Sequence, residues 1–430
     1  MQQLKIIRSL YIRMLPITRH RQSPSSRQFI LLMILVGLNL RPALSSLAPL
    51  LPRIESEGEL SVLTLSLLTT LPVLCLGLFA PVSPWLTRHL GMERSLALGL
   101  IVLSTGLALR GFANAPMLYL GTLLIGAAIG VVGTLLPALV KRELANSADL
   151  MTGVYTMALC LGGALGAGLS IPLAEALSSW SLSLMTWTSL ALSALLAWWL
   201  IMPQPAADPQ FKTANGHARA LLRNPLAWQV MLLMGSQSSL AYIVFGWLPT
   251  LLVKQGYSDH EAGWLMSASI FIQLFSAIAA PWLARMSKDQ RPALIATLVL
   301  VGIGLLILLL GPTALRWPGS ILLGLGQGGS FSLALTLIVL RSGNAKIAGE
   351  LSALVQGGGY TLAAMGPLIV GLMIDAQMSI QAITGFLLAI LAFAGAMAML
   401  AGRQLRLEID AQGTLVTVKQ QLPASNSQMH

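Results

Sequence analysis

Twelve apolar stretches of roughly 20 residues, each long enough to cross the hydrocarbon core of a bilayer, run through this chain. Short polar loops separate them, which leaves no room for a sizeable soluble domain. The hydrophobic share of 55%, with 10% charged residues, lies outside the range of water-soluble chains. We predict an all-α membrane protein with twelve transmembrane helices, over 29–51, 61–86, 95–112, 117–140, 150–173, 180–202, 226–253, 262–284, 292–311, 319–340, 349–374 and 380–401.

A polar break divides these stretches into two groups of six. The break carries four prolines together with charged and amide side chains, a composition typical of a linker. We predict a basic tail over 1–28, a six-helix bundle over 29–202, a linker over 203–225, a second six-helix bundle over 226–402 and a tail over 403–430.

Lysine and arginine alternate between the two sides of these segments. Of 26 such residues, 21 fall on the side of the N-terminus, four on the opposite side, and Arg41 inside the first span. Cytoplasmic loops hold the excess of positive charge, so we expect both termini to be cytoplasmic in a bacterial inner membrane. The net charge of +11 then reflects membrane topology, and we expect the lipid bilayer, not nucleic acid, as a partner.

The two halves share a sequence repeat. Residues 84–88 (PWLTR) match residues 281–285 (PWLAR) at an offset of 197, and Arg94 and Arg291 each follow six residues later. Three glycines of the fourth span match three of the tenth at an offset of 198, although close helix packing alone also explains glycines. The repeat predicts two pseudo-symmetric bundles.

The loops that follow these repeats resemble a loop of the major facilitator superfamily. The stretch 88–94 is similar to that family's cytoplasmic loop between its second and third helices, without the usual Asp-Arg centre. In the family such loops latch the two halves in one of the alternating states. The resemblance implies the major-facilitator fold, and a latch role for Arg88, Arg94, Asp289 and Arg291.

Five further motifs resemble the cyanate and nitroimidazole permease family (CynX/NimT). They are NLRPALSS at 39–46, TTLP at 69–72, LPALVKR at 136–142, GWLP at 246–249 and QGGGY at 356–360. The resemblance covers nearly the whole chain. It implies a secondary transporter of cyanate-like ions or nitroimidazole-like heteroaromatics.

Arg41 is the one charge in the middle of a predicted span. A central arginine costs about 2.5–3.5 kcal/mol on insertion scales, which favours a polar cavity over lipid as its surroundings. Its planar guanidinium suits planar anions and other hydrogen-bond acceptors. Pro42 removes a backbone donor beside it and predicts a kink. Snorkelling, or capping of a neighbouring helix, remains the structural alternative.

Polar side chains at the same depth are the candidate partners of Arg41. Gln356 and Tyr360 share a helix face and are our preferred pair, and Ser45 lies on the face of Arg41. The remaining candidates are Asn39, Gln237 and Gln327. Gln273 and Tyr242 are further polar side chains within apolar segments. Interhelical hydrogen bonding also explains the buried glutamines. Arg110, at the end of the third span, either attracts anions to an outer vestibule or snorkels.

The residues that are absent limit the mechanism. No Asp, Glu or His falls in the middle of a predicted span, which disfavours a dedicated proton carrier and leaves exchange, uniport or substrate-borne protons. The two cysteines provide no metal site, and no nucleotide-binding motif is present. We expect a monomeric transporter of a small molecule, with no catalytic residues, metal or cofactor. The alternatives are a multidrug or metabolite efflux permease, a channel and an intramembrane enzyme.

Overall fold

The computed structural model describes residues 24–50, 53–54, 62–203, 218–287, 289–410 and 412–419. Most of the predicted N-terminal tail (1–23), the centre of the predicted linker (204–217), Lys288 in the second loop and the last residues of the predicted C-terminal tail (420–430) lie outside these residues.

Within the described residues, eleven helices are long and apolar enough to cross a membrane, and a pair bent by 51° makes a twelfth span. This confirms the prediction of twelve transmembrane spans. The first half contains α2 (Ser26–Leu40) with α3 (Pro42–Ser45), the bent pair α5 (Val62–Phe79) and α6 (Val82–Leu90), α7 (Met92–Leu109), α8 (Ala115–Glu143), α9 (Ala148–Ala176) and α10 (Trp180–Ile201). The second half contains α13 (Pro225–Lys254), α14 (Asp259–Arg285), α15 (Arg291–Leu310), α16 (Arg316–Leu340), α17 (Ala345–Asp375) and α18 (Ile380–Ala401), preceded by the short α12 (Ala218–Arg223).

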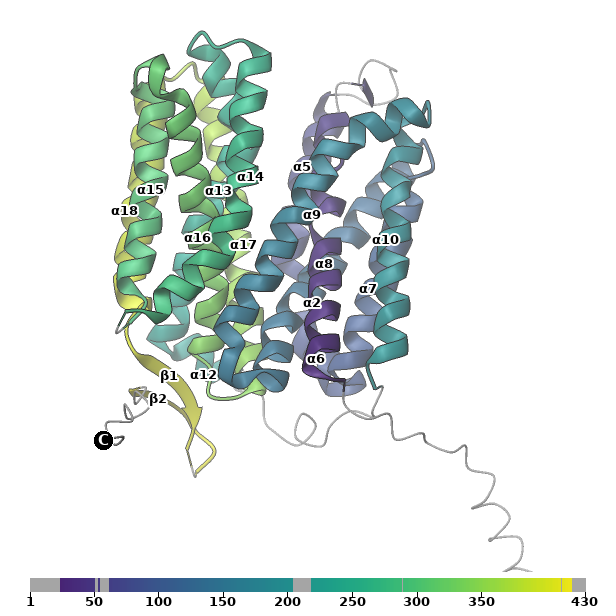
Figure 1. Ribbon diagram of the computed structural model, residues 1–430, viewed down its shortest axis with the longest axis vertical. Coiled ribbons are helices and arrows are strands. Elements are labelled where there is room, and N and C mark those ends of the chain that lie inside the picture. Colours follow the sequence, from purple (N-terminus) through teal and green to yellow (C-terminus); the bar gives the residue numbers. More distant parts are fainter. Residues whose placement is uncertain are drawn as a thin grey trace, which may run out of the picture.

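The two halves form separate bundles that meet at one end of the molecule (Figure 1). We call the end that carries strands β1 and β2 the hairpin end, and the opposite end the far end. At the hairpin end one continuous hydrophobic core includes both halves, for example Leu139 and Val339. Beyond it, toward the far end, each half has its own core, around Leu184 in the first and Leu248 in the second. Among the described residues, the core that the two halves share therefore lies toward the hairpin end.

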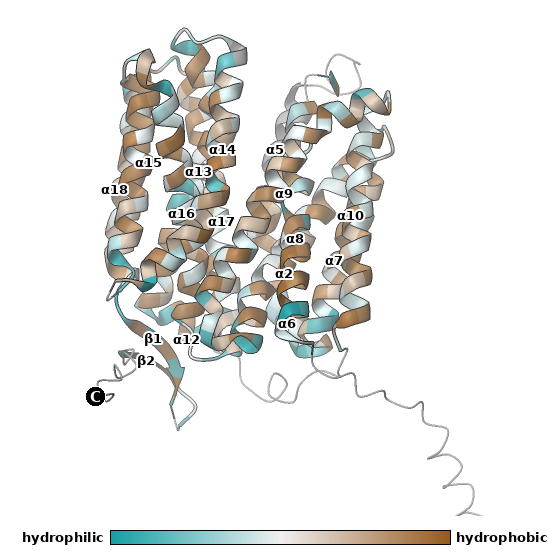
Figure 2. Ribbon diagram, viewed as in Figure 1, coloured by the Kyte–Doolittle hydropathy of each residue, from teal (hydrophilic) through white to brown (hydrophobic). Residues whose placement is uncertain are grey.

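Figure 2 shows hydrophobic residues along the length of both bundles, with hydrophilic residues gathered mainly at the two ends. Large apolar side chains such as Leu196, Phe271 and Leu372 are more than half exposed. Such surfaces require lipid as their solvent.

The sequence repeat reappears as a pair of matched contacts at the hairpin end. Arg142, at the end of α8, pairs with Glu93 at 2.6 Å. Arg341, following α16, donates at 2.6 Å to Oε1 of Gln290. Glu93 and Gln290 are separated by the 197 residues of the repeat. In each half, an arginine at the end of the fourth helix thus contacts a residue at the start of the third helix.

The predicted C-terminal tail contains a β-hairpin, which sequence analysis missed. β1 (Leu405–Ile409) pairs antiparallel with β2 (Leu415–Lys419). Leu407 is fully buried, donates its N–H to the carbonyl of Arg341 and accepts from the N–H of Gly343. Isolated two-stranded hairpins are marginally stable in water, so this docking onto the loop after α16 stabilises the pair. The all-α description holds for the membrane-spanning part.

Arg110 requires a correction, because the structure supports neither alternative considered for it. Its side chain is fully buried; Nη1 donates at 2.6 Å to the carbonyl of Ala43, and Nη2 donates at 2.9 Å to the hydroxyl of Thr122. It therefore joins the first, third and fourth spans inside the first half. A charge near a helix end in sequence gives no sign of such inward burial.

Replacing Arg110 with methionine should lower the free energy of unfolding by about 2–3 kcal/mol, because the hydrogen bonds to a charged group are lost and the Ala43 carbonyl is left unpaired. Unfolding of the purified protein in detergent measures the loss. Arg316→Met is the matched control, since Arg316 forms a partly exposed ion pair with Glu261 and should contribute less than about 1 kcal/mol. Equal losses in the two variants would contradict this role of Arg110.

Candidate functional site

The first span is interrupted at Arg41, as Pro42 predicted. α2 ends at Leu40 and α3 begins at Pro42, since proline has no N–H to continue the helical ladder. The interruption packs closely on α9, where a Cβ at Gly166 would lie 2.7 Å from Cα of Pro42. The stem of Arg41 lies over neighbouring Gly163, which offers no side chain to obstruct it.

Arg41 faces a pocket whose other walls come from the second half. The lining residues are Arg41, Ser238, Ala241, Tyr242, Phe245, Gln273, Gln327 and Phe331. The central guanidinium carbon lies 4.8 Å from the centroid of the Phe331 ring, a cation–π contact. Among the described residues, the Arg41 guanidinium has no hydrogen-bonding or ion-pair partner. Its donors are therefore available to a ligand in the pocket.

The pocket lies where the two halves separate. Leu233 of α13 belongs to the core shared by both halves, whereas Leu240 and Leu248 of the same helix belong to the separate core of the second half. Ser238 and Tyr242 line the pocket between these two regions. Along α13, the shared core therefore precedes the pocket, on its hairpin-end side.

The pocket carries no negative side chain. Among the described residues that line it, Arg41 is the one charged residue, and neither Asp nor Glu is present. Within the described part of the chain, no group of three His, Cys, Asp or Glu side chains is placed to hold a metal ion. The described lining of the pocket is therefore positively charged, and the charge comes from Arg41.

The structure brings some of the predicted partners to Arg41. Gln327 lines the pocket and accepts a 3.2 Å hydrogen bond from Nε2 of Gln273. Tyr360 packs edge-on against Tyr242 with ring centroids 6.4 Å apart, directly behind the pocket wall. Gln356 instead donates at 3.1 Å to the carbonyl of Gly133 and so connects the two halves.

Three predicted residues make packing contacts elsewhere. Asn39 donates to the carbonyl of Leu35 in its own helix at 2.8 Å, and Ser45 donates to the carbonyl of Gly163 at 2.8 Å. Gln237 donates to the hydroxyl of Ser238 at 2.7 Å and does not line the pocket. Sequence reasoning missed Phe331, Phe245 and Ser238, because apolar and small side chains occur throughout membrane helices and give no distinguishing signal.

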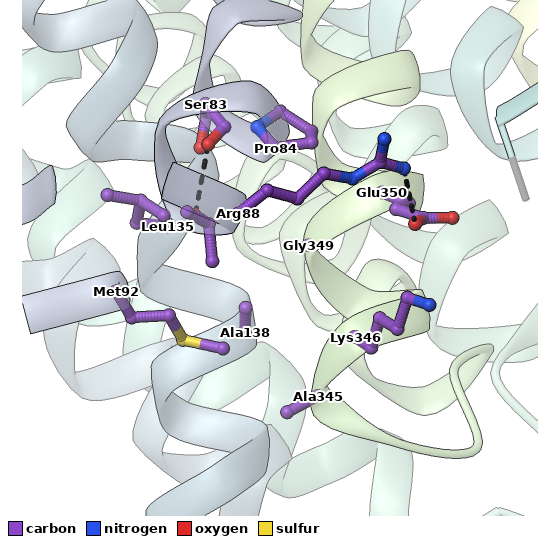
Figure 3. Close-up of a pocket in the computed structure, with 11 residues that line it drawn as sticks. Ser83, Pro84, Arg88, Met92, Leu135, Ala138, Ala345, Lys346, Gly349 and Glu350 are labelled. Carbon is purple, nitrogen blue, oxygen red and sulfur yellow. Dashed lines mark hydrogen bonds and ion pairs between the residues drawn. The ribbon is translucent and has the colours of Figure 1, made fainter. Parts of the chain in front are cut away.

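Two ion pairs connect the halves at the hairpin end. Arg88 of α6 lies 3.7 Å from Glu350 of α17, beside a small pocket that Lys346 and Met92 also line (Figure 3). Arg285 of α14 binds Asp149 of α9 through both Nε and Nη2. Arg88 and Arg285 occupy equivalent positions of the repeat. Each half therefore contributes one arginine to an acid of the other half.

Two other predicted latch residues, Asp289 and Arg291, pair with each other in the part of the chain that the structure describes. Arg291 donates from Nε to Oδ2 of Asp289 at 2.8 Å, within one loop. This hydrogen bond lowers the pKa of Asp289, so the carboxylate stays charged below its usual range. Arg94 lies exposed in the first turn of α7.

Comparison with known proteins places these features in a family. The model of the major facilitator superfamily matches residues 33–367. The chain is 37% identical to the uncharacterized transporter YycB of Bacillus subtilis (strain 168), over 89% of this chain and 96% of that protein. It is 34% identical to the 2-nitroimidazole transporter of Escherichia coli (strain K12), covering 80% and 87% of the two chains. It is 31% identical to the cyanate transport protein CynX of the same strain, covering 80% and 89%.

Solved structures show the same fold. The transporter FucP, described as being in the outward conformation, superposes with a TM-score of 0.71 at 14% sequence identity, covering 87% of this chain and 98% of that one.

Proposed function

Because the chain belongs to the major facilitator superfamily and is therefore a multi-pass membrane transporter, we propose that it carries a small planar anionic or polar solute bound at Arg41. The solute moves by alternating access, in which the pocket between the halves opens to one side of the membrane at a time. The protein acts as a monomer in the bacterial inner membrane.

The unpaired guanidinium of Arg41 is the observation that carries this proposal. An arginine at membrane depth is costly unless a partner or water satisfies it, and no described residue does so here. Because the Phe331 ring covers one face, a ligand approaches the donor edges of the guanidinium. Those edges match two acceptor oxygens in one plane, as in carboxylate-like, nitrate-like or nitro groups.

The named relatives support this class of solute. One is called a 2-nitroimidazole transporter and one a cyanate transport protein, and both match about four fifths of this chain. Nitro groups and cyanate both present hydrogen-bond acceptors to a donor such as Arg41. We therefore propose cyanate-like ions and nitroimidazole-like heteroaromatics as the substrates.

The efflux of cationic drugs is the alternative that the pocket disfavours. A cation would need a negative partner, and the lining contains a cation and no carboxylate. An intramembrane enzyme is disfavoured in the same way, because the pocket offers no nucleophile with an adjacent base.

We assign the hairpin end to the cytoplasm, because the positive-inside count puts both termini there. The structure then represents a state closed to the cytoplasm by the Arg88–Glu350 and Arg285–Asp149 ion pairs. Importing an anion against an inside-negative potential costs about 2.3 kcal/mol per 100 mV, so net import requires exchange, a co-transported proton or consumption of the solute.

Uptake into proteoliposomes tests the proposal. Vesicles containing the purified protein should accumulate labelled cyanate or 2-nitroimidazole in a saturable manner, with a dependence on membrane potential and pH gradient that identifies the coupling. Empty vesicles measure passive entry, which matters for the neutral heteroaromatic. Uptake no faster than in empty vesicles, together with transport of a cationic dye, would favour the efflux alternative.

A further inference from the structure

Two glutamines of the second half form an isolated amide pair in the wall of the Arg41 pocket. Gln273 comes from α14 and Gln327 from α16, and their exposed fractions are 5% and 4%. Nε2 of Gln273 donates to Oε1 of Gln327 at 3.2 Å. Among the described residues, Nε2 of Gln327 has no acceptor. A buried amide donor is therefore left unsatisfied beside the pocket.

This imbalance does not depend on how the two amides are oriented. If both side chains are rotated, Gln327 becomes the donor to Gln273, and the pair still uses only one of its four amide N–H groups. If only one is rotated, two like atoms face each other and the hydrogen bond is lost. In either consistent orientation, the hydrogen bond within the pair leaves amide N–H groups that the pair does not use itself. Buried polar groups in proteins are nearly always paired, so an unpaired one beside a pocket indicates a missing acceptor.

The amide pair and Arg41 belong to different halves of the transporter. A solute that contacts both would tie the first half to the second through the pocket. Binding that joins the halves stabilises an occluded state relative to an open one, because only the closed arrangement makes both sets of contacts. A solute bound by Arg41 alone contacts only the first half, so its binding would not favour the occluded state over the open one.

We infer that the Gln273–Gln327 pair is a second recognition point, which donates a hydrogen bond to an acceptor atom of the solute while Arg41 holds its anionic or nitro group. The inference rests on the proposed function and narrows the substrate class. Preferred solutes are planar and carry a second acceptor besides the group held by Arg41. Solutes that lack this second acceptor leave the amide unpaired and bind less tightly.

A matched pair of ligands tests the inference. The ring of 2-nitropyrrole has C–H in the place where 2-nitroimidazole has an acceptor nitrogen and carries the same nitro group, and binding is measured at a pH at which both rings are neutral. The wild-type protein should bind 2-nitroimidazole about 10-fold more tightly, the ratio expected from one net hydrogen bond. In Gln327→Leu the ratio should fall to about one. The double variant Gln273→Leu/Gln327→Leu should give the same ratio, and it leaves neither amide unpaired.

Gln229→Leu is the matched control, because Oε1 of Gln229 accepts a hydrogen bond from Arg403 outside the pocket. This variant should keep the wild-type ratio. Arg41→Gln should weaken both ligands by the same factor and leave the ratio unchanged. Equilibrium binding to purified, monodisperse protein gives all five ratios.

The outcomes separate this inference from the proposed function. A wild-type ratio retained in both leucine variants would show that the amides do not contact the solute. An equal loss of both ligands in those variants would assign the pair a purely structural role and would also overturn the inference. If the wild type binds neither ligand, the proposed solute class fails, and the inference fails with it.

Discussion

Arg41→Gln is expected to weaken solute binding by about 100-fold and to abolish transport at low solute concentration. Glutamine keeps a polar group of similar reach but removes the positive charge and the paired donor edge that matches a planar acceptor. Charge-assisted hydrogen bonds in a water-poor pocket are the strongest single contacts available to such a ligand. Binding to detergent-purified protein and uptake into proteoliposomes measure the two losses.

Arg41→Lys separates charge from geometry. Lysine retains the cation but presents a compact ammonium without the planar fork, so we expect an intermediate loss of about 10-fold. Arg316→Gln is the control for a general loss of positive charge, because Arg316 pairs with Glu261 at the far end. Wild-type affinity in Arg41→Gln would contradict the role of Arg41 and would shift attention to Tyr360 and Gln356.

Gly77→Ala is expected to open the hairpin end and to reduce transport by at least about 10-fold, since packed interfaces switch between discrete states and do not stretch. Gly77 of α5 lies against α17 of the other half. A Cβ there would lie 2.8 Å from the backbone nitrogen of Thr361 and 2.9 Å from the carbonyl oxygen of Gly357. Backbone atoms cannot move aside as a flexible side chain can. The closed state is therefore penalised relative to states in which the halves separate here.

Spin labels can report this shift directly. His89 and Met286 are exposed on different halves at the hairpin end, and His89→Cys with Met286→Cys provides two sites once Cys75 and Cys160 are replaced. The distance distribution should lengthen in Gly77→Ala. Gly395→Ala should leave it unchanged, because nothing lies within 4 Å of a Cβ at that position. An unchanged distribution and a normal transport rate in Gly77→Ala would show that closure does not require this contact.

The ion pairs between the halves and the Arg41 pocket differ in their symmetry. The repeat places Arg88 and Arg285 at equivalent helix ends, and each reaches an acid of the opposite half. The two ion pairs are thus related by the approximate symmetry of the repeat. The pocket is asymmetric, because the first half contributes the charge and the second half contributes the aromatic ring and the amides. A solute bound in such a pocket contacts both moving parts.

The sequence by itself determined the number of spans, the division into two halves and the repeat between them. The physical reason is local. In a bilayer each helix must satisfy its own backbone hydrogen bonds, so span length and hydropathy can be read segment by segment. Arg41 was identified for a related reason, since a charge at the centre of an apolar run is costly wherever that run packs.

Only the tertiary structure decided which side chains meet. Gln237, Gln273 and Gln327 are indistinguishable in sequence, yet the first is satisfied by Ser238 while the other two form an incomplete pair beside Arg41. The burial of Arg110 and the docking of the β-hairpin on the loop after α16 were equally hidden. These contacts join residues from different segments, and the periodicity of one segment carries no information about the partner it packs against.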